Sequence, residues 1–174
     1  MSFKFLKLKN TRNKGVTLIE MILYFGLLSI FLVVLTEIFA SILEVRTESE
    51  ATSAVEQDGR FLIARFAFDL KQASSISIPP NLGDSSNSLS VIIGGDNYTY
   101  TLSGGNFQLS NSFGINNLNS SETQIFAPSS GSIFTRIGNP VGKDTIRIQF
   151  TLRSLTQRKQ GPEERTFQTT IGRR

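Results

Sequence analysis

Residues 16–43 read VTLIEMILYFGLLSIFLVVLTEIFASIL, and this stretch decides the fold of the N-terminal part of the chain. Within it Met21–Thr36 carries no charged side chain. Together with Val16–Ile19 it makes about 20 residues, the length that a helix needs to cross a hydrocarbon core of ~30 Å. Only Glu20 interrupts the apolar run. Because a carboxylate near the start of a membrane helix costs on the order of 2–3 kcal/mol, we expect Glu20 to have a partner.

The positive charge of the chain is concentrated before this run. The 174 residues have a formal net charge of +4, and residues 1–15 hold five cations and no acid. These cations are Lys4, Lys7, Lys9, Arg12 and Lys14. By the positive-inside rule the N-terminus stays in the cytoplasm and the C-terminal part lies outside. Residues 72–135 contain no Lys or Arg, so we expect no nucleic-acid binding by the main body.

The composition argues against an enzyme. The chain has no Cys and no His, which excludes thiol and imidazole catalysis and the usual zinc ligands. The carboxylates after the helix are scattered, and only Glu163 and Glu164 are adjacent. Neither the spacing of a calcium-binding EF-hand nor a phosphate-binding glycine loop occurs. We therefore expect no catalytic residue and no metal site.

The junction between the basic segment and the apolar run carries the most specific motif, which reads KGVTLIE and ends at Glu20. It resembles the processing signal of type IV prepilins, in which a basic leader ends in Gly and is followed by one residue, Thr or Ser, Leu, an aliphatic residue and Glu. The resemblance implies that a prepilin peptidase of the inner membrane cleaves between Gly15 and Val16, and that Val16 is then N-methylated. Val16 departs from the commoner Phe or Met. The residues that the resemblance assigns to assembly are Thr17, Leu18 and Glu20.

The resemblance also implies a function for Glu20. Cleavage leaves an ammonium group on Val16 at the end of an apolar helix, and burying an isolated charge among neighbouring helices is strongly unfavourable. A carboxylate from an adjacent subunit neutralises it and sets the register between subunits. A simpler interpretation, compatible with the first, is that Glu20 interacts with the positive end of the helix dipole.

Two other interpretations of the apolar run stay open. A secretory signal peptide needs a small-residue cleavage site, and the residues 39–41, Phe-Ala-Ser, with Glu37 nearby are a poor match. A plain single-span anchor for an extracytoplasmic, adhesin-like ligand-binding domain accounts for the hydropathy but gives Glu20 no role. A further hypothesis keeps the processing and places an adhesin at the tip of a pilus.

The helix is predicted to continue beyond the membrane. From Glu37 to Ala73 there is no Pro, and apolar or small residues recur three and four positions apart, as on one helical face. We expect one helix over about residues 17–74, with the apolar segment FLIARFAFDL (61–70) against a sheet. Many major pilins have a Pro where this chain has Glu37, so no kink is predicted there.

The end of this helix carries a second, less specific resemblance. Arg60, Arg65 and the sequence DLKQA at 69–73 are similar to the helix end of minor pseudopilins from type II secretion systems. Some pseudopilins bind calcium, but the scattered Asp and Asn residues of this chain assign no ligand set, so no cofactor is predicted.

The rest of the chain predicts a polar β layer. Residues 74–88 are rich in Ser, Pro, Asn and Gly and are predicted to form the turn that ends the helix. Residues 146–152 alternate apolar and polar side chains and are predicted to pair with a final strand over 165–171. Shorter strands are predicted over 89–93, 98–102 and 106–109, with Phe134 and Ile137 marking another. The Ser- and Asn-rich surface of residues 74–132 favours an ordinary outward face over an adhesive one.

We therefore predict an α+β protein with a type IV pilin-like fold, in which a long N-terminal helix packs on a C-terminal antiparallel β-sheet domain. The predicted parts are a basic leader over 1–15, a transmembrane and assembly helix over 16–36, its amphipathic continuation over 37–75 and an extracytoplasmic β-rich domain over 76–174. The resemblance implies a minor pilin or pseudopilin with a single span in the inner membrane before assembly into a type IV pilus or type II secretion pseudopilus. Its implied partners are the membrane, other pilin subunits, the prepilin peptidase and the inner-membrane assembly platform.

Overall fold

The computed structural model describes residues 15–129, 131–138 and 143–173. The basic leader predicted over residues 1–15 therefore lies, apart from Gly15, outside the described residues. The chain divides into two compact units, Met1–Leu43 and Glu44–Arg174.

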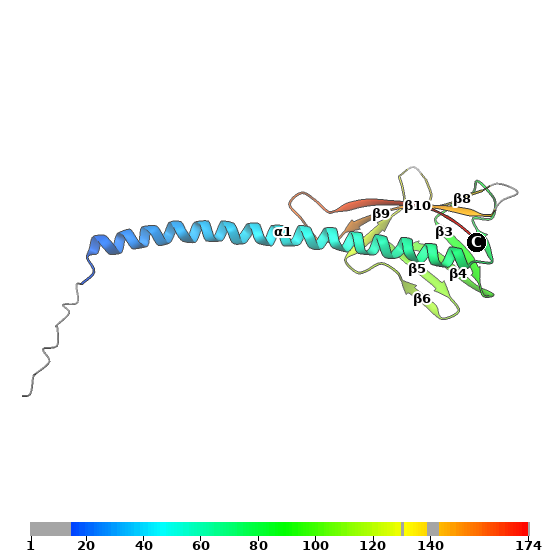
Figure 1. The fold of residues 1–174 in the computed structure, drawn as a ribbon, viewed down its shortest axis with the longest axis horizontal. Coiled ribbons are helices and arrows are strands. Elements are labelled where there is room, and N and C mark those ends of the chain that lie inside the picture. Colours follow the sequence, from blue (N-terminus) through cyan, green and yellow to red (C-terminus); the bar gives the residue numbers. More distant parts are fainter. Residues whose placement is uncertain (1–14, 130, 139–142, 174) are drawn as a thin grey trace, which may run out of the picture. The chain divides into compact units, whose positions relative to one another are not determined.

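The predicted α+β class is confirmed by one long helix followed by antiparallel strands (Figure 1). The helix α1 spans Leu18–Gln72, 55 residues, and passes Glu37 without interruption. Its bounds lie close to the predicted ones. The strands in the described residues are β1 (Ser75–Ile78), β2 (Ser85–Ser86), β3 (Ser88–Ile93), β4 (Asp96–Ser103), β5 (Asn106–Asn111), β6 (Gly114–Asn117), β7 (Thr123–Phe126), β8 (Phe134–Ile137), β9 (Thr145–Ser154) and β10 (Glu164–Gly172).

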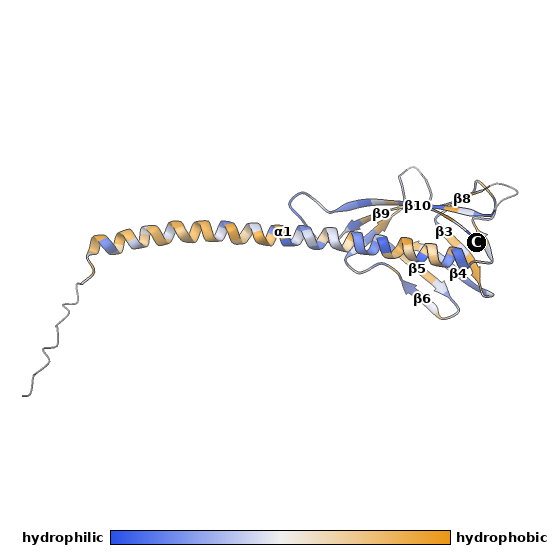
Figure 2. Cartoon of the chain, viewed as in Figure 1, coloured by the Kyte–Doolittle hydropathy of each residue, from blue (hydrophilic) through white to orange (hydrophobic). Residues whose placement is uncertain are grey.

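The helical part of the first unit is apolar on all sides. Thr17 caps its start, because the Thr17 hydroxyl accepts a hydrogen bond from the backbone N–H of Glu20 at 3.3 Å. Beyond Glu20 the side chains are almost entirely aliphatic or aromatic, and the hydrophobic colour covers this stretch in Figure 2. A helix that is apolar all round is one that packs against lipid or against other helices.

The second unit contains two antiparallel sheets that share the C-terminal half of α1. The first sheet has the strand order β1-β3-β4-β5-β6, and the second has the order β10-β9-β8-β2 with β7 also paired to β9. In Figure 1, β8, β9 and β10 are drawn above the helix and β5 and β6 below it. A hydrogen bond from the Ile125 N–H to the Gly105 carbonyl, at 2.8 Å, links β7 to the turn before β5 and so connects the two sheets.

Phe66 of α1 fills the space between the sheets. Its ring makes edge-to-face contacts with Tyr100 and Phe107 of the first sheet, at centroid distances of 5.0 and 5.4 Å. It makes similar contacts with Phe134 and Phe150 of the second sheet, at 5.6 and 6.4 Å. Since all five rings are fully buried, the helix is the central element of this core and not a cover on one side. The predicted packing of residues 61–70 against a sheet is confirmed, and the segment in fact contacts two.

The long strand pair was predicted correctly. The strands β9 and β10 pair antiparallel, with Phe150 opposite Phe167 and Ile146 opposite Ile171. The strands predicted over 89–93, 98–102 and 106–109 are present as β3, β4 and β5, and Phe134 and Ile137 are the ends of β8.

The prediction that residues 74–88 form only a turn was wrong. This segment contains β1 and β2, which pair with β3 and β8. The cause is tertiary, because Ile76 enters the core and Arg136 fixes the chain that follows. The Arg136 guanidinium donates to the carbonyls of Pro79 and Pro80 at 2.9 and 2.6 Å and pairs with Asp144 at 2.9 Å. The strands β6 and β7 were also not predicted, since four residues are too few to establish an alternating pattern.

Candidate functional site

The predicted assembly motif lies at the start of α1. Gly15 and Val16 precede the helix, and Leu18 is its first residue, with its side chain 80% exposed. The structure brings Thr17 and Glu20 together through the capping hydrogen bond. Glu20 also accepts a hydrogen bond from the Tyr24 hydroxyl, with 3.2 Å between Tyr24 Oη and Glu20 Oε1. Tyr24 was not among the predicted site residues, although its position one turn after Glu20 is visible in the sequence.

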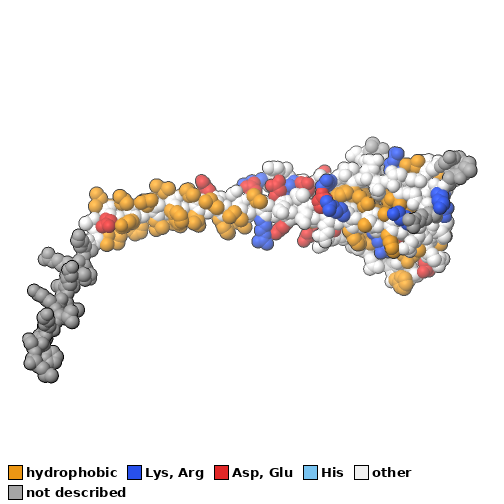
Figure 3. All heavy atoms as spheres, in the orientation of Figure 1, with side chains coloured by type: hydrophobic (Ala, Val, Ile, Leu, Met, Phe, Trp, Pro, Cys, Tyr) orange, Lys and Arg blue, Asp and Glu red, His pale blue; other side chains and the backbone are white. Residues whose placement is uncertain are grey.

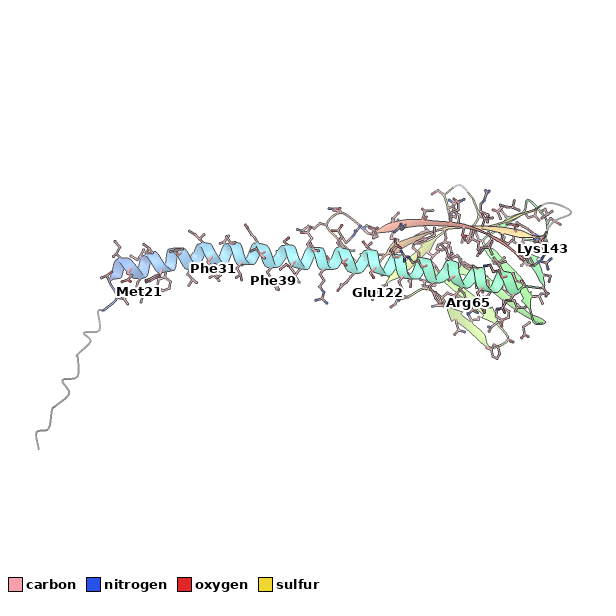
Figure 4. All side chains as sticks on the ribbon, in the orientation of Figure 1. Met21, Phe31, Phe39, Arg65, Glu122 and Lys143 are labelled. Carbon is pink, nitrogen blue, oxygen red and sulfur yellow. The ribbon has the colours of Figure 1, made fainter. Side chains whose placement is uncertain are left out.

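The helix after this motif presents an apolar surface with nothing from the described chain against it. Every large apolar side chain from Val16 to Leu43 is between 45% and 80% exposed. Hydrophobic atoms cover this stretch in Figure 3, and the side chains of Met21, Phe31 and Phe39 project from it in Figure 4. A continuous exposed apolar surface of this size marks a site of interaction with a membrane or with protein.

In the second unit, the carboxylate of Asp58 fixes the segment before β7 to the helix. Asp58 Oδ2 accepts hydrogen bonds from the Ser120 N–H at 2.9 Å, the Ser120 hydroxyl at 2.8 Å and the Thr123 hydroxyl at 2.5 Å. Asn119 continues this network, since its amide donates to the Thr123 carbonyl at 2.9 Å and its side-chain oxygen accepts from the Phe107 N–H at 3.1 Å. The buried side chain of Asp58 is thus satisfied by hydrogen bonds from Ser120 and Thr123. No local pattern in the sequence indicates these contacts, because the partners lie more than 60 residues away.

Two residues of the pseudopilin-like pattern meet at the other end of the packed helix. Arg65 Nε pairs with Asp69 Oδ2 at 2.7 Å, and the Tyr100 hydroxyl donates a hydrogen bond to the same oxygen. Burial, together with the hydrogen bond and the negative charge of Asp69, raises the pKa of the Tyr100 hydroxyl above its usual value. Arg60 is on the solvent side and pairs with Glu56 at 3.2 Å. The pattern therefore fastens the helix end to β4 in this structure.

Gly59 is the one Gly of the packed helix, and the structure explains it. The ring of Phe167 from β10 lies directly over the Gly59 Cα, so that a Cβ added there would overlap the ring. Phe167 is in turn stacked on Phe150, with 5.7 Å between the centroids and 20° between the planes. This close approach needs a residue without a side chain.

The carboxylates in the part of the chain that the structure describes form no cluster of metal ligands. No group of three or more Asp and Glu residues in those ranges is arranged to hold a metal ion. A cleft of about 550 Å³ lies beside the helix, and its acidic lining residues are Glu50 and Glu122. Glu50 is already ion-paired with Arg46 at 2.9 Å.

Comparisons with family models, curated proteins and solved structures found no match to the chain. The architecture itself, a long apolar N-terminal helix packed on antiparallel β-sheets, is compatible with that of a pilin-like protein. The apolar part of α1 is long enough to be a membrane span or a signal sequence. Any finer assignment rests on the residues at the start of the helix.

Proposed function

We propose that the protein is a minor pilin or pseudopilin, a structural subunit that is processed after Gly15 and assembled through its N-terminal helix into a type IV pilus or a type II secretion pseudopilus. The observation that carries the proposal is the combination of the KGVTLIE motif with the exposed apolar helix that follows it directly. An ordinary anchor needs such a helix but not the motif.

The two halves of α1 differ in how far their apolar side chains are buried, and this difference supports the proposal. From Ala51 onward one face of the helix is buried inside the second unit, where Leu62, Phe66 and Leu70 have almost no exposed surface. Residues before Leu43 bury none of theirs within the described chain. The first half is therefore available for the membrane before assembly and for neighbouring helices afterwards, while the second half holds the β-sheets.

Glu20 would act in assembly through the charge that processing creates. Cleavage converts the Val16 amide nitrogen into an ammonium group, which in an apolar fibre interior needs a counter-charge. Glu20 is the only acid between Gly15 and Thr36, and no Lys or Arg occurs in that range. The carboxylate of one subunit would pair with the ammonium group of the next.

The test is to produce the full chain in cells with and without a prepilin peptidase and to determine the N-terminus of the membrane-bound protein. We expect the mature protein to begin at Val16 only when the peptidase is present. A leader that stays intact with an active peptidase would contradict the proposal and favour the single-span anchor.

Assembly is tested separately with Glu20→Ala, for which Glu37→Ala is the matched control on the same helix. Glu20→Ala should be inserted and cleaved but absent from sheared fibres, whereas Glu37→Ala should enter them. Normal incorporation of Glu20→Ala would refute the role of this carboxylate.

A further inference from the structure

The carboxylate of Glu20 has a partner within its own helix. The Tyr24 hydroxyl donates to Glu20 Oε1 at 3.2 Å, across one helical turn. We propose that Tyr24 is a positioning residue for Glu20, which satisfies one carboxylate oxygen in the bilayer and leaves the other, Oε2, open to the ammonium group of a neighbouring subunit. This inference rests on the proposed function, because it is the membrane and the assembly step that give the hydrogen bond its purpose.

Tyr24 differs from the other hydroxyl side chains of the apolar run in the group that accepts its hydrogen bond. The hydroxyl of Ser29 donates to the carbonyl of Phe25 and that of Thr36 to the carbonyl of Leu32, both at 2.8 Å. Such bonds to the preceding turn are the usual way for short hydroxyl side chains to be satisfied in a helix. The phenol of Tyr24 is held away from its own backbone by the ring, and its partner is a side chain instead.

Glu20 in turn has no other side-chain donor within reach in the described residues. Residues 15–45 contain no Lys or Arg, and the Thr17 hydroxyl accepts a hydrogen bond from the Glu20 backbone instead of donating to its carboxylate. In a hydrocarbon environment an acceptor without a donor is expensive, so the phenol lowers the cost of placing this acid at the membrane.

The difference in charge explains why a phenol suits this position better than a cationic side chain. A Lys or Arg one turn after Glu20 would neutralise the carboxylate permanently and compete with the incoming ammonium group. A neutral hydroxyl donates one hydrogen to one oxygen, fixes the side-chain rotamer and keeps the negative charge available. Tyr24 therefore prepares the carboxylate for pairing without replacing the partner.

Membrane insertion of the full chain tests the inference without using processing or assembly. The chain contains two N-glycosylation sequons after the helix, at Asn97 and Asn119, which are modified in microsomes when the C-terminal part crosses the membrane. Leu32→Lys is introduced into every variant so that insertion is incomplete and the ratio of glycosylated to unmodified chains can be measured.

The key variants are Tyr24→Phe and the double substitution Tyr24→Phe with Phe25→Tyr. The double substitution keeps the composition of the helix and only moves the hydroxyl off the face of Glu20. We expect the double substitution to lower the insertion ratio roughly threefold, the size of a typical side-chain hydrogen bond between polar groups in a membrane. Tyr24→Phe alone also makes the helix more apolar, so its effect is compared with that of the same substitution in a Glu20→Ala background. In a Glu20→Ala background, Tyr24→Phe should not lower the ratio.

Equal insertion of the double substitution and the parent chain would overturn the inference, and so would an equal effect of Tyr24→Phe in the parent and in the Glu20→Ala background. The failure of the proposed function looks different. If the leader is never cleaved but the two residues are coupled in insertion, the hydrogen bond stands and the pilin assignment falls. If the leader is cleaved but Tyr24 and Glu20 are not coupled in insertion, the pilin assignment stands and the positioning role of Tyr24 falls.

Discussion

We expect Gly59→Ala to have two opposing effects on the free energy of unfolding. Replacing Gly by Ala inside a helix ordinarily stabilises it by about 1 kcal/mol. Here the new methyl group overlaps the ring of Phe167, which lies over the Gly59 Cα. Overpacking of a core costs about 1–3 kcal/mol, and displacing the ring from its stack on Phe150 costs about 0.5–1.5 kcal/mol more. We therefore expect a net loss of about 0.5–3.5 kcal/mol in the free energy of unfolding.

The sign of the effect should reverse when the ring is absent. In a Phe167→Ala background the clash disappears and only the helix propensity remains, so Gly59→Ala should stabilise by about 1 kcal/mol. The measurement is urea unfolding of the full chain in detergent, followed by the fluorescence of the tyrosines. Ala64→Gly, at an exposed position of the same helix, is the control and should lose about 1 kcal/mol in both backgrounds. A neutral or stabilising Gly59→Ala in the parent chain would show that the ring is not fixed over the helix.

Two further predictions concern the hydrogen bonds made to the buried carboxylates of Asp69 and Asp58. Because the pKa of Tyr100 is raised in the folded state, the unfolded chain loses this proton first, so stability should fall as the pH rises above about 10, by up to about 1.4 kcal/mol per pH unit. Unfolding at several alkaline pH values should show this extra slope in the parent and not in Tyr100→Phe, and equal slopes would count against the burial of the hydroxyl. Asp58→Ala leaves the donors of Ser120 and Thr123 without an acceptor and should lower the free energy of unfolding by about 2–4 kcal/mol, whereas Asp58→Asn, which keeps an acceptor oxygen, should lose less. Thermal unfolding of the two variants side by side checks this, and equal losses would mean that the hydrogen bonds are not responsible.

The elements with long, regular patterns were predictable from the sequence, and the contacts between them were not. The uncharged apolar run of residues 21–36 and the three-and-four spacing of apolar residues after Glu37 together predicted α1, and the alternation around Phe150 predicted β9. By contrast, β6 is exposed at every residue and β7 has four residues, so neither shows a pattern that separates it from a loop. These strands exist because neighbouring strands and the helix offer them hydrogen bonds.

The candidate site divides in the same way. The motif around Glu20 is local, so its spacing is recognisable in the sequence alone, and the same is true in principle of Tyr24. The partners of Asp58 and Gly59 come from segments more than 60 residues later, and no local pattern marks a carboxylate or a Gly that will meet them. The sequence therefore predicted the local motif at Glu20 and the apolar segment 61–70, and it did not predict the distant contacts of Asp58 and Gly59.

The position of Phe66 between the sheets decides where the chain can be shortened for crystallisation. The β-sheets lose the centre of their core if the second half of α1 is removed, so a soluble fragment cannot begin at β1. A fragment that starts at Glu44 keeps every buried residue of the helix, from Ala51 to Leu70, and also the contact of Lys159 with Glu44 at 2.6 Å. Such a fragment would lack the exposed apolar half of the helix, which requires detergent, and would keep a complete hydrophobic core.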